Sequence, residues 1–299
     1  MTVCYSKLRE SMTKGSSAKS ELRVRQKLGK YRIERKLGSG GFACVYQAMD
    51  TIQGIRVALK IPYAQYVTDT VLSDFRKEIR TTAGLDHPNI LMIKDASIID
   101  DRLVVVLPLG LETLQERMMR RFCLETSIQI AEQVLEATAT AHSQNVIHCD
   151  IKPENVILFP GNHVRLADFG IAKVSQRTIQ GGGTGTVGYM APEQAMGRPS
   201  FRSDVFSLGL IIWRLTSGCW PEWPFEWPFA GHQRLRGRLH PDFIQFMRRA
   251  IYLNPRHRYR DAQQMLSAFQ RLKSRTLRFA EQRRARQRAR TSSGRRRSA

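Results

Sequence analysis

The chain is 299 residues long, carries a formal net charge of +22 and contains five scattered cysteines. This length can build one large domain or two lobes around a substantial core, and cysteines without C-x-x-C pairing favour neither a zinc site nor a disulfide framework. The longest apolar runs, residues 103–111 and 205–213, are too short to span a membrane, and residues 1–8 lack the apolar stretch of a signal peptide. We therefore expect a soluble cytoplasmic protein.

The positive charge is concentrated at the two ends. Residues 1–30 carry eight basic and two acidic residues, and residues 271–299 carry twelve basic residues and one acidic residue. The first segment is polar and shows no sustained periodicity, so we expect a largely disordered basic arm over residues 1–30, with a short helix near residues 21–28. We expect the Arg-rich tail, residues 274–299, to be part helix and part disordered.

The middle of the chain predicts an α+β fold in two lobes. Strands are predicted over residues 31–37, 42–48, 57–61, 90–98 and 103–107, with one helix over residues 72–85. Helices are predicted over residues 114–122, 126–143, 203–217, 241–251 and 262–273. We expect a small antiparallel β lobe over residues 31–107, a hinge over 107–110 and a larger helical lobe over 111–273.

Two motifs close together in sequence indicate a reaction. Residues 148–155 read H-C-D-I-K-P-E-N, and residues 168–170 read D-F-G. Phosphoryl transfer needs a carboxylate beside the incoming hydroxyl and oxygen ligands that hold Mg²⁺ on the nucleotide phosphates. Asp150, Asn155 and Asp168 could supply these groups.

At these residues the chain resembles the protein kinase superfamily, whose catalytic loop reads H-R-D-x-x-x-x-N and whose metal-binding turn reads D-F-G. The resemblance implies a bilobal kinase fold, ATP as phosphoryl donor, Mg²⁺ or alternatively Mn²⁺ as metal, and protein substrates. It also implies that Asp150 accepts, or at least orients, the proton of the substrate hydroxyl, while Asn155 and Asp168 bind the metal. Lys152 points to serine or threonine acceptors. Among the branches, the chain looks most like bacterial Ser/Thr kinases of the eukaryotic type.

The same resemblance implies a nucleotide site in the small lobe. Residues 38–45 read G-S-G-G-F-A-C-V between two predicted strands, where glycines let the backbone approach phosphate oxygens. Lys60 is expected to bind the phosphates and to pair with Glu78. The expected ATP-binding residues are Leu37, Gly38, Ser39, Gly40, Gly41, Phe42, Ala43, Val45, Ala58, Lys60, Val106, Leu107 and Leu109.

Further matches lie downstream and have scaffold or regulatory roles in the resembling family. Glu193 of Ala191-Pro192-Glu193 is expected to pair with Arg258, and Asp204 to anchor the catalytic loop. The activation segment contains three threonines that are available for phosphorylation, Thr178, Thr184 and Thr186, and Thr186 matches the threonine beside the acceptor pocket.

Cys149 departs from the family pattern, because most members have arginine there. A cysteine cannot pair with a phosphorylated residue of the activation segment. We therefore predict that activity depends weakly on phosphorylation of this segment and survives the combined substitution Thr178→Ala and Thr184→Ala. The alternative, that Cys149 and Cys44 act as redox sensors, competes with the common case of cysteines as inert fillers.

Two segments lie outside the catalytic motifs. Residues 220–229 read W-P-E-W-P-F-E-W-P-F, which cannot form a helix and either packs on the large lobe or presents aromatic rings to a partner. The tail could bind a polyanion or an acidic partner, or be a solvated segment. Two rival functions remain open at this level: a pseudokinase scaffold, and a nucleic-acid-binding protein in which the basic ends dominate.

Overall fold

The computed structural model describes residues 21–41, 43–68, 73, 79, 84–169 and 187–297 of the chain, with side chains to residue 289. The described residues form two compact units. The small unit contains residues 21–84 and 92–109, and the large unit contains residues 85–91, 110–169 and 187–297. This division confirms the predicted two-lobe kind of fold.

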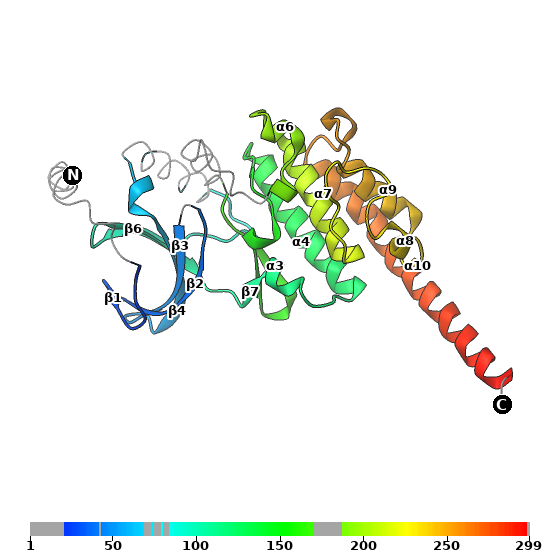
Figure 1. Cartoon of the computed structure of the whole chain (residues 1–299), viewed down its shortest axis with the longest axis horizontal. Coiled ribbons are helices and arrows are strands. Elements are labelled where there is room, and N and C mark those ends of the chain that lie inside the picture. Colours follow the sequence, from blue (N-terminus) through cyan, green and yellow to red (C-terminus); the bar gives the residue numbers. More distant parts are fainter. Residues whose placement is uncertain are drawn as a thin grey trace. The chain divides into compact units, whose positions relative to one another are not determined.

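The small unit is a six-stranded antiparallel sheet, coloured blue to cyan in Figure 1. Its strands follow the order β1-β2-β3-β4-β6-β5. Their bounds are β1 Lys27–Leu28, β2 Tyr31–Ser39, β3 Ala43–Asp50, β4 Ile55–Pro62, β5 Asp95–Ile99 and β6 Arg102–Pro108, and a 3-10 turn at Ala64–Tyr66 follows β4. Successive side chains of a strand point to opposite faces. One face therefore buries an apolar cluster that includes Cys44, Tyr46, Ala48, Val57, Leu59, Ile61, Val104 and Val106.

Residues 21–30 contribute strand β1 to this sheet and form no helix, so the short helix expected near residues 21–28 is wrong. Strand β1 pairs with the start of β2, and Leu22 and Leu28 are buried in the apolar cluster. Burial of these two side chains on the sheet outweighs the weak local preference for helix. The small unit thus begins before Tyr31, and the expected disordered arm does not include residues 21–30.

The large unit is mainly helical. Its helices are α3 Leu114–Arg117, α4 Leu124–Ser143, α6 Pro192–Ala195, α7 Phe201–Ser217, α8 His232–Arg236, α9 Pro241–Ala250 and α10 Ala262–Arg297. A small sheet has the order β7 Glu112–Thr113, β8 Val156–Phe159 and β9 His163–Leu166, and 3-10 turns lie at Pro153–Asn155, Pro160–Asn162, Val187–Tyr189 and Pro255–His257. Helices α4, α7, α9 and α10 pack together (Figure 1). Helix α7 is buried almost all round, as its apolar sequence predicts.

Two predicted elements end differently in the structure. Helix α3 starts with a capping box at Thr113 and Glu116 but ends at Arg117, whose guanidinium lies 4.0 Å from the centroid of the Phe122 ring as the chain folds back. The predicted strand over residues 90–98 is shortened to β5, because the Asn89 side chain donates to the Val164 carbonyl (2.8 Å) and holds this segment in the large unit. The predicted helix over residues 72–85 lies mostly outside the described residues.

Helix α10 is much longer than the helix predicted over residues 262–273. Thr276 and Ala280 are buried beyond that boundary, and from residue 281 to 289 every side chain is exposed. The end of α10, red in Figure 1, extends past the other helices of the large unit. Among the described helices, α10 included, none is both long and apolar enough to cross a membrane.

The Trp/Pro-rich loop, residues 220–229, packs mainly on the large unit. Phe225 and Phe229 are buried, and the Trp213 ring of α7 makes edge contacts with Trp227 (5.9 Å between centroids) and Phe229 (5.1 Å). Trp223 is the exception, with 70% of its surface exposed. Most aromatic residues of this loop therefore pack against the large unit, as one of the two interpretations from the sequence expects.

Candidate active site

The catalytic loop of the large unit lies between α4 and β8 and presents the Asp150 carboxylate between two partners. The Asn155 side-chain amide donates to Asp150 Oδ2 at 2.9 Å, and Lys152 Nζ lies 2.8 Å from the same oxygen. The Asp150 side chain stays about a third exposed, at 35%. The 3-10 turn at Pro153–Asn155 returns the chain so that Asn155 reaches Asp150. The structure thus brings together three residues that the sequence motif selected.

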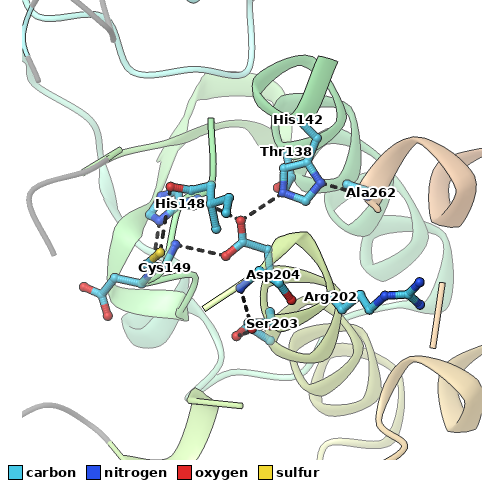
Figure 2. Close-up of polar contacts among 12 residues, drawn as sticks. Thr138, His142, His148, Cys149, Arg202, Ser203, Asp204 and Ala262 are labelled. Atoms are coloured by element: carbon cyan, nitrogen blue, oxygen red, sulfur yellow. Dashed lines mark hydrogen bonds and ion pairs between the residues drawn. The ribbon is translucent and has the colours of Figure 1, made fainter. Parts of the chain in front are cut away.

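Asp204 anchors this loop from helix α7. Its carboxylate is buried and accepts hydrogen bonds from the backbone N–H groups of His148 (2.7 Å) and Cys149 (2.9 Å). It accepts a third bond from His142 Nε2 (2.9 Å), a side chain of α4 (Figure 2). The Ala262 N–H donates to His142 Nδ1 (3.0 Å), so the proton of the neutral ring is on Nε2 and points to Asp204. A buried carboxylate needs such donors to offset its lost hydration.

His148 connects the catalytic loop to the D-F-G turn. Its Nδ1 accepts from the Asp150 N–H (3.2 Å), and its Nε2 donates to the Ala167 carbonyl (2.9 Å). The ring also packs on Phe169, with 4.6 Å between centroids. Asp168, between Ala167 and Phe169 in the sequence, has a left-handed backbone with φ of 64°. Asp tolerates this conformation better than most residues with a Cβ.

Asn155 and Asp168 fit a divalent metal by the chemistry of their side chains. Both amide hydrogens of Asn155 are accepted by Asp150, one by its carbonyl (2.8 Å) and one by its carboxylate. Asn155 can therefore offer only its side-chain oxygen to a further partner. The Ala167 N–H donates to the Asn155 carbonyl (2.7 Å), which places Asp168 on the neighbouring segment. Hard oxygen ligands from one carboxylate and one amide suit Mg²⁺, which completes its coordination with water and phosphate.

In the small unit, strand register places four predicted nucleotide residues on one face of the sheet. Val45 of β3 pairs with Lys60 of β4, and Ala58 of β4 pairs with Leu107 of β6. Residues directly opposite each other share a face, as do residues two apart in one strand. This shared face lies opposite the apolar cluster.

The glycine-rich turn joins β2 to β3 beside this face. Gly38 pairs with Val45 and Ser39 with Cys44, and the Gly40 N–H donates to the Ala43 carbonyl (2.9 Å). Among the described residues, a Cβ added at Gly38 would meet no atom within 4 Å. The backbone of this turn therefore leaves room for a ligand, and Leu37 before it is 38% exposed.

The strand period corrects the expectation for Val106. This side chain pairs with Leu59 and is buried in the apolar cluster, on the face opposite Ala58 and Lys60. Val105 pairs with Lys60 and lies on the shared face. The assignment from sequence is one residue out of register, and one residue in a strand changes the face. Leu109 follows the end of β6 and is half-buried.

Several expected site residues lie outside the described residues. These are Phe42, Glu78, Thr178, Thr184 and Thr186. The proposed pairing of Lys60 with Glu78 stays a prediction.

Glu193 and Arg258 form the expected ion pair in the large unit. Arg258 donates to the two carboxylate oxygens at 2.7 and 3.1 Å, and Ser203 Oγ donates to one of them at 2.8 Å. The other guanidinium N–H groups donate to the carbonyls of Arg202, Tyr252 and Leu253. Burial would raise the pKa of Glu193, but the hydrogen bond and charge of Arg258 outweigh burial and hold this pKa below its ordinary value.

Two residues that contact the catalytic loop or its anchor were not selected from the sequence. His142 is buried in the last turn of α4 and contacts Asp204. Gln194 directly follows Glu193, and its side-chain amide donates to the Cys149 carbonyl at 2.5 Å. A histidine on the buried face of a helix and a glutamine beside a motif carry weak signals, because each is common without any role at a site.

Comparison with known proteins places these features in one family. The family model described as "Protein kinase domain" matches residues 31–287. The chain is 37% identical over 199 residues to the serine/threonine-protein kinase PrkC of Bacillus subtilis, covering 64% of this chain and 31% of PrkC. It is 36% identical over 217 residues to the serine/threonine-protein kinase PknA of Mycobacterium tuberculosis, covering 68% of this chain and 48% of PknA. The chain thus spans between about a third and a half of these relatives.

Solved structures agree with this result at the level of fold. The crystal structure of the Mycobacterium tuberculosis PknI kinase domain has a TM-score of 0.64 and 23% sequence identity, and it covers 85% of this chain and 100% of that domain. A double mutant of the same domain has a TM-score of 0.67 and covers 84% of this chain and 99% of that domain. The chain therefore belongs to the protein kinase family, and its relatives include bacterial serine/threonine-protein kinases.

Proposed function

We propose that this domain transfers the γ-phosphoryl group of ATP to serine or threonine hydroxyls of protein substrates in the cytoplasm, and also to its own chain. The observation that carries the proposal is the Asp150 carboxylate, held between Asn155 and Lys152 on an anchored loop. Phosphoryl transfer relies on positioning and electrostatic stabilisation, which such a loop can supply.

The side chains of the loop divide the work. Asp150 orients the acceptor hydroxyl and takes its proton, because a partly exposed carboxylate can reach a substrate group. Lys152, 2.8 Å from Asp150, is placed to neutralise negative charge that develops on the transferred group. In the small unit, Lys60 binds the nucleotide phosphates and pairs with Glu78, and the glycine-rich turn covers the phosphates with its backbone.

A divalent metal, Mg²⁺ or alternatively Mn²⁺, would be held by Asp168 and the side-chain oxygen of Asn155. When bound, it neutralises charge on the phosphate oxygens. Removing metal with a chelator abolishes transfer, and adding Mg²⁺ restores it. Asp168→Asn raises the Mg²⁺ concentration required for activity, while thermal unfolding without metal stays near that of the wild type.

The proposed reaction is tested by transfer of labelled γ-phosphate to a protein substrate. Asp150→Asn keeps the volume of the side chain but removes the base, so the rate falls by about 100-fold or more. The matched control is Glu222→Gln, which also removes one carboxylate, but from an exposed position, and should keep full activity. Equal rates for wild type and Asp150→Asn, with both proteins folded, contradict the proposal. No transfer above background by either protein favours a scaffold that binds without catalysis.

A second proposed role belongs to the basic end of α10, residues 281–297. This segment carries eight arginines and one acidic residue, Glu281, and its described side chains are exposed. It lacks the large apolar side chains of helices that insert into membranes. These properties support binding of a phosphate polymer through release of counterions.

Binding of the full chain to a short fluorescent DNA duplex at several salt concentrations tests this role. Replacing Arg283, Arg284, Arg286 and Arg288 by glutamine weakens binding. The slope of the logarithm of the binding constant against the logarithm of the salt concentration becomes less steep by about 0.9 for each phosphate that the helix no longer neutralises. The charge-matched control replaces four exposed arginines of the large unit outside α10 by glutamine: Arg234, Arg236, Arg238 and Arg256. Equal weakening by both sets contradicts a site on α10.

A further inference from the structure

Cys149, the residue that precedes Asp150, is held through both of its backbone polar groups by side chains from distant elements. Its N–H donates to Asp204 Oδ1 on α7 at 2.9 Å. Its carbonyl accepts a hydrogen bond from Gln194 Nε2 on α6 at 2.5 Å. Cys149 itself has a left-handed backbone with φ of 65°, a conformation that residues with a Cβ adopt only when the surroundings require it. These two side chains supply such surroundings.

Gln194 is well suited to hold the loop because its own position is fixed. The side chain is only 6% exposed. The preceding residue, Glu193, is tied to Arg258 through two hydrogen bonds and to Ser203 through a third. The Gln194 N–H donates to the Ala191 carbonyl (3.0 Å). A donor on such a supported segment keeps its geometry better than one on a mobile loop.

The backbone polar groups beside Asp150 have defined partners. The Asp150 N–H donates to His148, and the Asp150 carbonyl accepts from Asn155 (2.8 Å). The Cys149 carbonyl differs from these two groups, because its partner comes from the Ala191-Pro192-Glu193 end of the activation segment. Gln194 therefore links that end of the segment to the catalytic loop, one peptide away from Asp150.

We propose that Gln194 is a positioning residue that holds Asp150 in place without help from a phosphate. This inference rests on the proposed function. Cys149 cannot bind a phosphate as an arginine would, so order in the loop has to come from another contact. The hydrogen bond from Gln194 connects the same two segments, the activation segment and the catalytic loop, and it is present in the chain without modification.

The substitution Gln194→Met tests the contact with little change in side-chain length. It removes the N–H donor, so kcat falls by about ten-fold or more while KM for ATP changes by less than about two-fold. The matched control is Gln263→Met on the exposed side of α10, which keeps the wild-type kcat. Wild-type kcat in Gln194→Met would overturn the inference.

Gln194→Glu separates a hydrogen-bond donor from a space-filling role. A carboxylate cannot donate to the Cys149 carbonyl, whereas a protonated carboxyl group can. Burial favours the protonated form. The ratio of the kcat of Gln194→Glu to that of the wild type should therefore rise as the pH is lowered from about 8 to about 6. A ratio independent of pH contradicts the role of Gln194 as a donor.

Amide hydrogen exchange distinguishes failure of this inference from failure of the proposed function. In Gln194→Met, exchange in the peptide that contains residues 148–150 should be faster than in the wild type, whether or not the chain transfers phosphate. Faster exchange with an inactive wild type rejects the proposed function and retains the contact. An active wild type whose exchange and kcat are unchanged by Gln194→Met rejects the inference.

The combined substitution of Thr178→Ala with Thr184→Ala should leave kcat within about two-fold of the wild type, and a larger loss also rejects the inference.

Discussion

Asp204 shows at the residue scale how one buried carboxylate can order a catalytic loop. It is 1% exposed and accepts two backbone N–H groups and the His142 ring. Hydrogen bonds to a charged acceptor are stronger than neutral ones, especially away from water. The same residue thus compensates its own burial and fixes the backbone on the N-terminal side of Asp150.

Asp204→Asn should therefore lower the free energy of unfolding by about 3 kcal/mol, because the amide presents its NH₂ group to N–H donors and leaves at least one of them unpaired. Urea unfolding measures the change. Asp242→Asn is the matched control, since the Asp242 side chain is 50% exposed in its pair with Arg275 and a surface pair contributes about 1 kcal/mol or less. Similar losses in both variants would argue against the anchoring role.

The sequence motifs predicted which residues form the site better than they predicted which distant residues form hydrogen bonds with them. Asp150, Lys152 and Asn155 lie within six positions, and local geometry alone brings them together. Contacts such as Gln194 with Cys149 join residues 45 positions apart, and no local pattern signals them. The error at Val106 has another cause, since a register shift of one residue leaves the apolar pattern of β6 almost unchanged in the sequence.

At the scale of elements, the Trp/Pro-rich loop supports the segment that leads into Ala191-Pro192-Glu193. The Trp220 ring contacts the Tyr189 ring with 4.1 Å between centroids, and the Arg214 guanidinium lies 4.9 Å from the centre of the Trp220 ring. A Cβ added at Gly188 would lie 2.1 Å from Trp220 Cζ2. The ring is held on more than one side, so it cannot easily retreat.

Gly188→Ala should accordingly destabilise the fold by about 1–3 kcal/mol through overpacking. Thermal and urea unfolding measure the loss. If the clash with Trp220 is the cause, the double variant Gly188→Ala with Trp220→Ala should lose less than the sum of the two single variants. Additive losses would show that Gly188 matters for another reason.

The ion pair between α6 and Arg258 predicts a dependence of stability on pH. The folded pKa of Glu193 is below its ordinary value, so its ionised form is favoured by folding. The resulting stabilisation is present above the unfolded pKa, about 4.3, and is lost as the pH falls through the lower, folded pKa.

Glu193→Gln should thus lower the free energy of unfolding most near neutral pH. The difference from the wild type should shrink as the pH falls below about 4. Denaturant unfolding at several pH values measures it, with Glu222→Gln as the exposed control. A difference that stays constant from neutral to acid pH would contradict the assignment of the charge effect to this pair.

Element types were predictable where the apolar period was long, and element ends were not. The period over α4 and α7 predicted both helices to within a few residues of Leu124–Ser143 and Phe201–Ser217. Residues 21–28 form no helix because Leu22 and Leu28 are buried on a sheet built from later parts of the chain. Long-range burial of this kind cannot be read from a local window.

For the whole molecule, α10 raises the question of where the packed kinase domain ends. The sequence placed this end at Lys273, where the apolar pattern gives way to arginines. The structure continues the packing: Thr276 and Ala280 are buried, and the Phe279 ring lies 5.5 Å from that of His240. Arg284 still reaches Glu125 of α4 at 2.9 Å. We infer that the packed domain extends to about Arg284 and that the remainder of the tail is an appendage.

Truncation of the chain tests this boundary. A chain that ends after Arg284 should unfold within about 1 kcal/mol of the full chain, because the removed side chains that the structure describes are exposed. A chain that ends after Lys273 loses buried surface on α10 and should be less stable by about 2–3 kcal/mol, which lowers Tm by several degrees. In the full chain, Ala280→Arg should reproduce much of this loss, and Ala285→Arg, at an exposed position, should not. Equal stability of the two truncated chains would show that the packed domain ends near Lys273.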